Sequence, residues 1–190
     1  WFLQSHVERA AKALFWSLLA MSLQNFKDLN ETASAEAETM PVQPAGHDER
    51  RATGRAGSNW QAARGAADVP SLISLGVGDM TADWSNRFLI RGDEDMPHAV
   101  FIACGDTLQS EWQMERLGET LEDSLPVELC SRFAEGCRRS LEEGCPVPVE
   151  GSYRNEANHE VLFRCVMMPV RAMNDAVEFV YGAYSHRLAA

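Results

Sequence analysis

The chain has 190 residues, of which 45% are hydrophobic, and this is enough to bury one sizeable core and hardly two. Its 28 acidic and 17 basic residues give a formal net charge of −11, which disfavours binding to nucleic acid and to anionic membranes. The five cysteines show no CxxC pair and no matching histidine spacing, so we expect reduced thiols in a cytoplasmic protein rather than a zinc site or a disulfide framework.

Residues 1–30 are predicted to form an amphipathic helix. Apolar residues recur there at spacings of four and three, at Val7, Ala11, Leu14, Leu18 and Met21. Two roles stay open for this helix: it packs onto its own domain, or it mediates dimerisation. The apolar run within it is shorter than the roughly 20 residues that a membrane-spanning helix needs.

Residues 31–70 are predicted to be a flexible linker. Their composition turns to Ala, Glu, Gly, Arg and Pro, and Trp60 stands out as a large apolar residue among them. Order is expected to return at Ser71, so residues 71–190 form the predicted folded domain.

A hairpin opens this domain. An extended run that contains Trp84 and Ile90 stops at a turn signal, residues 92–95, and a second strand is predicted from His98 to Cys104. Asp106, with a glutamine three residues later, predicts a capped helix after the hairpin.

The clearest element is a long helix between Pro126 and Gly144. Proline suits the first turn of a helix and glycine suits the position just past its end. Apolar residues recur every four positions between them, at Leu129, Phe133, Cys137 and Leu141.

Three strand-like runs follow, CPVPVEGSYRN, HEVLFRCVMMPVR and AVEFVYGAYSHRL. The middle run is apolar on both faces, so we expect an additional element to cover the outer face of the sheet. The N-terminal helix and a second subunit are the two candidates. A helix followed by such a meander predicts an α+β domain with a single antiparallel sheet.

The order of these elements resembles that of the PAS domain family. AVFIACG followed by ERLGETLEDSLP, with a conspicuous Gly118, and the closing FVYGAYSHR resemble the corresponding PAS segments, and residues 83–187 are most similar to short bacterial proteins that contain a single PAS domain. The asparagine that commonly ends the second PAS strand is replaced here by Cys104 and Gly105. The resemblance implies a PAS-like five-stranded antiparallel sheet with helices on one face, in addition to the N-terminal amphipathic helix.

The resemblance also allows the family's cofactors to be tested by residue. No histidine lies between Pro126 and Gly144 to bind haem axially, and no Asn-Cys-Arg-Phe type motif supports a flavin adduct, so the cofactor is unknown. A pocket between helix and sheet remains, and plain core packing is the competing interpretation for the residues that would line it. The candidate ligand-binding residues are Trp112, Phe133, Cys137, Met167, Phe179 and Tyr181.

The function that these observations favour is a PAS-type sensory or protein-interaction module in signal transduction. It would act in trans, without its own output domain, and the alternative is a structural dimerisation adaptor that binds no small molecule. We expect a protein partner, a homodimer and a small apolar ligand, and neither nucleic acid nor membrane. No enzyme is predicted, because no phosphate-binding loop or nucleophile elbow occurs. Cys137 is either a redox-sensing thiol or, as we favour, a buried and inert one.

Overall fold

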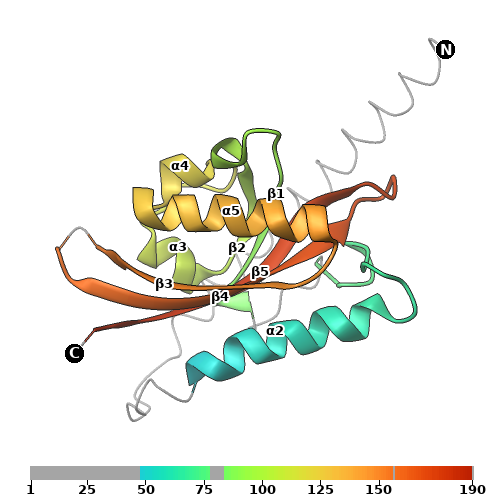
Figure 1. The fold of residues 1–190 in the computed structure, drawn as a ribbon, viewed down its shortest axis with the longest axis horizontal. Coiled ribbons are helices and arrows are strands. Elements are labelled where there is room, and N and C mark those ends of the chain that lie inside the picture. The colour runs from blue at the N-terminus through green and yellow to red at the C-terminus, as the bar shows by residue number, and fades with distance from the viewer. Residues whose placement is uncertain (1–47, 78–83, 156, 190) are drawn as a thin grey trace, which may run out of the picture. The chain divides into compact units, whose positions relative to one another are not determined.

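The computed structural model describes residues 48–77, 84–155 and 157–189, so the predicted N-terminal helix, residues 1–30, lies outside the described residues. Five antiparallel strands form one sheet in the order β2-β1-β5-β4-β3 (Figure 1). The elements in chain order are α2 (Asp48–Arg64), β1 (Arg87–Arg91), η2 (Met96–His98), β2 (Val100–Cys104), α3 (Asp106–Glu111), α4 (Leu121–Ser124), α5 (Val127–Glu143), β3 (Val147–Arg154), β4 (Glu160–Arg171) and β5 (Val177–Leu188). The predicted α+β class with a five-stranded antiparallel sheet is confirmed.

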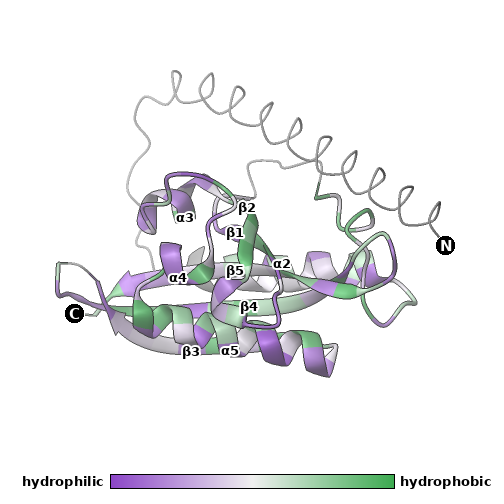
Figure 2. Cartoon of the chain, turned by 90° about the horizontal axis from the view of Figure 1, so that it is seen from above, coloured by the Kyte–Doolittle hydropathy of each residue, from purple (hydrophilic) through white to green (hydrophobic). Residues whose placement is uncertain are grey.

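The long helix α5 lies across the face of the sheet that we call the inner face (Figure 1). It begins at Val127, so Pro126 is the N-cap and not a residue of the first turn as predicted. It ends as predicted at Gly144, whose φ of 66° lies in the left-handed region that glycine tolerates. Figure 2 shows hydrophobic and hydrophilic residues alternating along α5, as expected of a helix with one buried face. At Gly136 the helix comes so close to the sheet that an added Cβ would lie 2.5 Å from the Met167 sulfur.

The opposite face of the sheet, the outer face, is covered by α2 (Figure 1). The prediction of a flexible linker is therefore wrong for residues 48–64. Ala52, Ala56 and Trp60 recur every four residues and are all buried, and the Trp60 indole N–H donates a hydrogen bond of 2.8 Å to the carbonyl oxygen of Pro169 in β4. The small alanines allow close approach to the strands. An additional element does cover the outer face, as expected. That element is α2, whereas the sequence suggested residues 1–30 or a second subunit.

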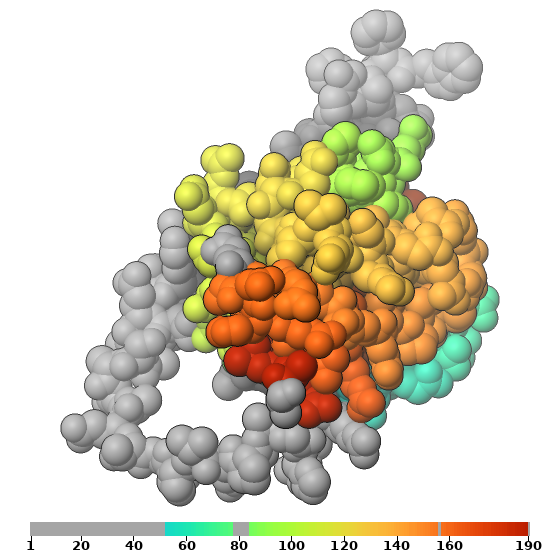
Figure 3. Space-filling model, turned by 60° about the vertical axis from the view of Figure 1, so that its left-hand side comes forward, coloured from blue at the N-terminus to red at the C-terminus, as the bar shows by residue number. Residues whose placement is uncertain are grey.

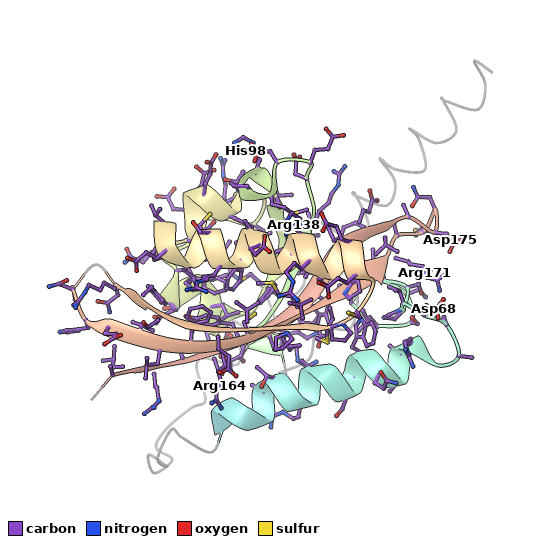
Figure 4. The ribbon with its side chains drawn as sticks, viewed as in Figure 1. Asp68, His98, Arg138, Arg164, Arg171 and Asp175 are labelled. Atoms are coloured by element: carbon purple, nitrogen blue, oxygen red, sulfur yellow. The ribbon has the colours of Figure 1, made fainter. Side chains whose placement is uncertain are left out.

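Arg171 fixes the segment that follows α2 to the end of β4 (Figure 4). Its Nε donates to the carbonyl oxygen of Val69 at 2.9 Å, and its Nη1 lies 3.3 Å from the Asp175 carboxylate. The backbone N–H of Arg171 donates to the carbonyl oxygen of Pro70, and its carbonyl accepts from Leu72. These contacts hold the segment between α2 and β1 against the end of β4.

The hairpin of β1 and β2 is confirmed, with its second strand beginning at Val100 because Met96–His98 form a 3₁₀ turn. The predicted cap of α3 is wrong by one residue. Gly105 is the N-cap, the Asp106 carboxylate accepts from the Thr107 N–H at 2.8 Å, and the Gln109 amide donates to the Cys104 carbonyl at 2.6 Å.

Candidate functional site

Five aromatic rings meet between α5 and the inner face of the sheet, and we call them the aromatic cluster. Each ring comes from a different part of the fold, and the centroids of neighbouring rings lie 5.2–6.4 Å apart. Such separations are those of favourable offset and edge-to-face pairs. The members are Phe88 of β1, Phe101 of β2, Trp112 directly after α3, Phe133 of α5 and Tyr184 of β5.

The indole N–H of Trp112 is the polar group in this cluster that lacks a partner. Trp112 is 6% exposed, and its Nε1 atom is buried with no hydrogen-bond acceptor among the described residues. Leaving a buried donor without an acceptor costs about 1–3 kcal/mol. An acceptor atom that reached this nitrogen, from a buried water or from another molecule, would recover that free energy.

Two tyrosine hydroxyls lie beside the cluster. The Tyr184 hydroxyl donates a buried hydrogen bond of 3.3 Å to the Tyr153 hydroxyl. Burial raises the pKa of both phenols, most strongly that of Tyr184, so both stay neutral at physiological pH. The two hydroxyls beside the cluster are therefore uncharged.

Tyr153 also lines a hollow at the surface, where the first turns of α5 face β3 and β4. The hollow has a volume of about 450 Å³. Figure 3 shows α5 lying directly against the β3–β4 hairpin at this end of the molecule. The other residues that line the hollow are Glu128, Arg132, Ser152, Arg154 and Glu160. Tyr153 thus lines the surface hollow and also contacts Tyr184, whose ring centroid is 5.2 Å from that of Trp112.

Four of the six predicted ligand-binding residues belong to the buried core on the inner face: Trp112, Phe133, Cys137 and Met167. The Cys137 and Met167 sulfur atoms are 3.8 Å apart. That these side chains contact a ligand stays a prediction.

Phe179 and Tyr181 lie on the outer face, so their grouping with the other four is wrong. Tyr181 pairs across the strands with Met168, not with Met167, and its ring centroid is 5.7 Å from that of Trp84. Side chains alternate between faces along a strand, so the inner-face residues of β5 are Val180, Gly182 and Tyr184. The sequence is apolar on both faces of β5, and only the pairing register tells the two apart.

Sequence reasoning missed three aromatic residues of this region, Phe88, Phe101 and Tyr184, and also Tyr153. Phe88 belongs to a predicted strand, but a single strand does not reveal which partner it faces. Strand alternation could have identified Tyr184. It lies two residues after Gly182, which pairs with Met167 of the inner face, so the Tyr184 side chain lies on that face too.

The surroundings of Cys137 make its thiol unreactive. Burial raises its pKa to about 12, and burial also raises the pKa of Cys165 on the facing strand. A reactive cysteine needs a lowered pKa and access to solvent. The geometry supports a structural role for Cys137 over the redox-sensing alternative.

We expect iodoacetamide at pH 8 to modify the exposed Cys145 at least about 100-fold faster than Cys137 in the native protein. With a pKa near 12, Cys137 is ionised in about one molecule in ten thousand at this pH. Peptide mass spectrometry after timed quenching measures both rates. Comparable rates would contradict the buried, protonated state of Cys137, and unfolding in urea should make both thiols react.

No cluster of three or more His, Cys, Asp or Glu side chains in the described part of the chain is arranged to hold a metal ion. Of the helices in residues 48–77, 84–155 and 157–189, none has the length and apolarity to cross a membrane.

The sheet order and the helix across its inner face define a single-sheet α+β domain, with the element order that the resemblance to PAS domains implied. No known family profile matches the chain, and no curated protein sequence is significantly similar to it.

Solved structures with a similar arrangement of elements include PAS and LOV domains. Vibrio cholera VqmA, solved as a ligand–DNA complex, is 15% identical over 52% of this chain and 45% of its own, with a TM-score of 0.43, so the chain spans about half the length of VqmA. The PAS-B domain of Drosophila melanogaster Cycle, solved with ethylene glycol, is 11% identical over 53% of this chain and 99% of its own (TM-score 0.39). A fungal LOV-domain photoreceptor is 14% identical over 53% of this chain and 74% of its own (TM-score 0.37). Similarities with TM-scores below 0.5 carry no argument about ligands or activity.

Proposed function

We propose that this domain is a PAS-type sensory or protein-interaction module that binds a small uncharged molecule next to Trp112 and performs no catalysis. The observation that carries the proposal is the buried indole N–H of Trp112, which lacks an acceptor among the described residues. A buried donor without a partner lowers the stability of the domain, and a ligand that carries an acceptor would offset this cost.

The surroundings of Trp112 define the chemistry of the molecule. The lining rings favour a flat, largely apolar ligand, and the indole N–H favours one that carries a carbonyl or another hydrogen-bond acceptor. Burial, and to a smaller extent the Glu111 carboxylate, raises the pKa values of the two tyrosines, so both hydroxyls are neutral and neither acts as a counter-ion for a charged ligand. The proposed ligand is therefore a small neutral molecule with one exposed acceptor atom.

Binding at this position would act on α5, because Phe133 of α5 packs against Trp112 with their ring centroids 5.6 Å apart. A ligand that favours one packing of α5 on the sheet shifts the population of that packing. The change would be read by a protein partner in trans. We place this activity in the cytoplasm, where the five free cysteines would stay reduced.

Native mass spectrometry of the full chain, purified without added small molecules, tests the ligand part of this proposal. We expect an additional bound mass that is lost in Trp112→Phe, which keeps an aromatic ring but removes the N–H. Trp84→Phe removes an indole N–H from the outer face and should retain the bound mass. A wild-type spectrum that shows the protein mass alone after gentle desolvation, with no mass retained from the lysate, would refute ligand binding.

The alternative function is a structural dimerisation adaptor without a small-molecule ligand. The close packing of the aromatic cluster favours it, since Phe88, Phe101, Phe133 and Tyr184 are each 0% exposed. Both functions include a homodimer, so the bound mass, and not the oligomeric state, distinguishes them.

A further inference from the structure

The two edge strands of the sheet, β2 and β3, differ in whether another segment of the chain pairs with them. The β2 edge is closed by the chain itself, because the Phe101 N–H donates to the Glu119 carbonyl and the Gly118 N–H donates to the Phe101 carbonyl. No comparable segment among the described residues pairs with the β3 edge. An open strand edge is a template on which another strand can pair.

The backbone groups of β3 that face away from β4 can be assigned. The Arg154 N–H donates to the Glu128 carboxylate at 3.3 Å, and the next N–H, that of Asn155, donates to the His159 carbonyl at 3.0 Å within the hairpin. Backbone groups alternate in direction along a strand, so Ser152 and Glu150 face outward with Arg154. Pro148 continues this series, and a proline within a sheet is tolerated where its missing N–H faces solvent.

We propose that a second copy of this chain pairs with the β3 edge in antiparallel register centred on Ser152. In this register Ser152 lies opposite Ser152 of the second copy, and Glu150 lies opposite Arg154 of the second copy, twice by symmetry. All three are residues whose backbone groups face outward, so the register matches the hydrogen-bonding pattern of an antiparallel pair once the Arg154 N–H exchanges the Glu128 carboxylate for the Glu150 carbonyl of the second copy. Their side chains are exposed and share one face of the sheet.

The charges beside this edge suit a copy of the same chain better than a strongly charged partner. The hollow next to Ser152 is lined by two acids, Glu128 and Glu160, and by two arginines, Arg132 and Arg154. Such a balanced set is self-complementary across a twofold axis. It offers attraction at the contact between two chains that each carry a net charge of −11.

This inference rests on the homodimer of the proposed function and assigns it a surface. Sedimentation equilibrium of the full chain and of three variants tests it. Glu150→Arg and Arg154→Glu each place like charges opposite one another at two positions of the dimer, and we expect each to weaken dimerisation by about tenfold or more. The double variant Glu150→Arg/Arg154→Glu restores opposite charges between the two copies. The Glu150–Arg164 ion pair of 3.6 Å that Glu150→Arg removes lies within each chain and is lost from monomer and dimer alike, so the dimerisation constant of the double variant should return to within about threefold of the wild-type value.

Matched controls carry the same changes in charge on the exposed face of α5. Glu142→Arg and Arg139→Glu break one surface ion pair each and should leave dimerisation unchanged. A wild-type dimer that both single edge variants leave intact, or a double variant as weak as the singles, would overturn the β3 interface while retaining the homodimer. A monomeric wild-type chain at all concentrations tested would overturn both.

Discussion

Replacing Phe133 by alanine is expected to lower the free energy of unfolding by about 3–5 kcal/mol, because it empties the centre of the aromatic cluster. Phe133 is 0% exposed, and its ring lies 5.4 Å from that of Phe88, 5.6 Å from that of Trp112 and 6.0 Å from that of Tyr184. These partners come from three other segments of the fold, so they cannot all close the cavity together. Urea unfolding monitored by circular dichroism gives the change.

Val127→Ala, at the start of the same helix, is the matched control. Val127 is 83% exposed, so its truncation should change the free energy of unfolding by less than about 0.5 kcal/mol. A loss below about 1 kcal/mol for Phe133→Ala would contradict the packing of α5 on the sheet, because a side chain buried at that position cannot be removed at so small a cost.

Replacing Trp60 by alanine is expected to cost a similar amount, about 3–5 kcal/mol. Trp60 is 2% exposed, and it supplies both the main apolar contact of α2 with the outer face and the hydrogen bond to the Pro169 carbonyl. Arg64 also lies over its ring, with the guanidinium carbon 5.8 Å from the ring centroid. Unfolding in urea measures the loss, and hydrogen exchange shows whether α2 has left the sheet.

Trp60→Phe separates the two contributions. It keeps most of the buried apolar area and removes the indole donor, so we expect an intermediate loss that leaves the Pro169 carbonyl without this partner. If α2 were the linker that composition alone suggested, Trp60→Ala would change stability no more than a surface substitution. Faster amide exchange in the parts of β4 and β5 that α2 covers would locate the effect of Trp60→Ala at the α2 contact.

The sequence predicted those elements of the fold that carry a local pattern of apolar, capping or turn residues. The helix α5 has a four-residue apolar period, a proline before it and a glycine after it; its C-terminal end was predicted correctly, and its N-terminal end lies one residue beyond the proline that was placed in its first turn. In the part of α2 whose burial is described, residues 52–64, the buried residues are two alanines and one tryptophan among glycines and arginines, so the composition resembles that of a linker. Its helical state comes largely from docking on the sheet, which a local pattern does not contain.

The candidate site was predictable only in part, for a related reason. Trp112 and Phe133 follow from apolar character and from the helix period, whereas Phe179 and Tyr181 were placed on the wrong face because β5 is apolar on both. The choice between the faces is made by the pairing of Met167 with Gly182, a long-range contact. The missing acceptor of Trp112 is likewise a property of the assembled core, and no spacing in the sequence encodes it.

The central functional claim is that the buried Trp112 N–H is the polar contact of a ligand site. The most direct test is ¹⁵N–¹H NMR of the indole groups in the full chain, with the Trp112 signal assigned through Trp112→Phe. The probes are acetophenone, which carries a carbonyl acceptor, and ethylbenzene, which has a similar shape and no acceptor. We predict a saturable downfield shift of the Trp112 N–H with acetophenone and none with ethylbenzene. The same response to both probes, or no saturable response to acetophenone, would contradict the claim.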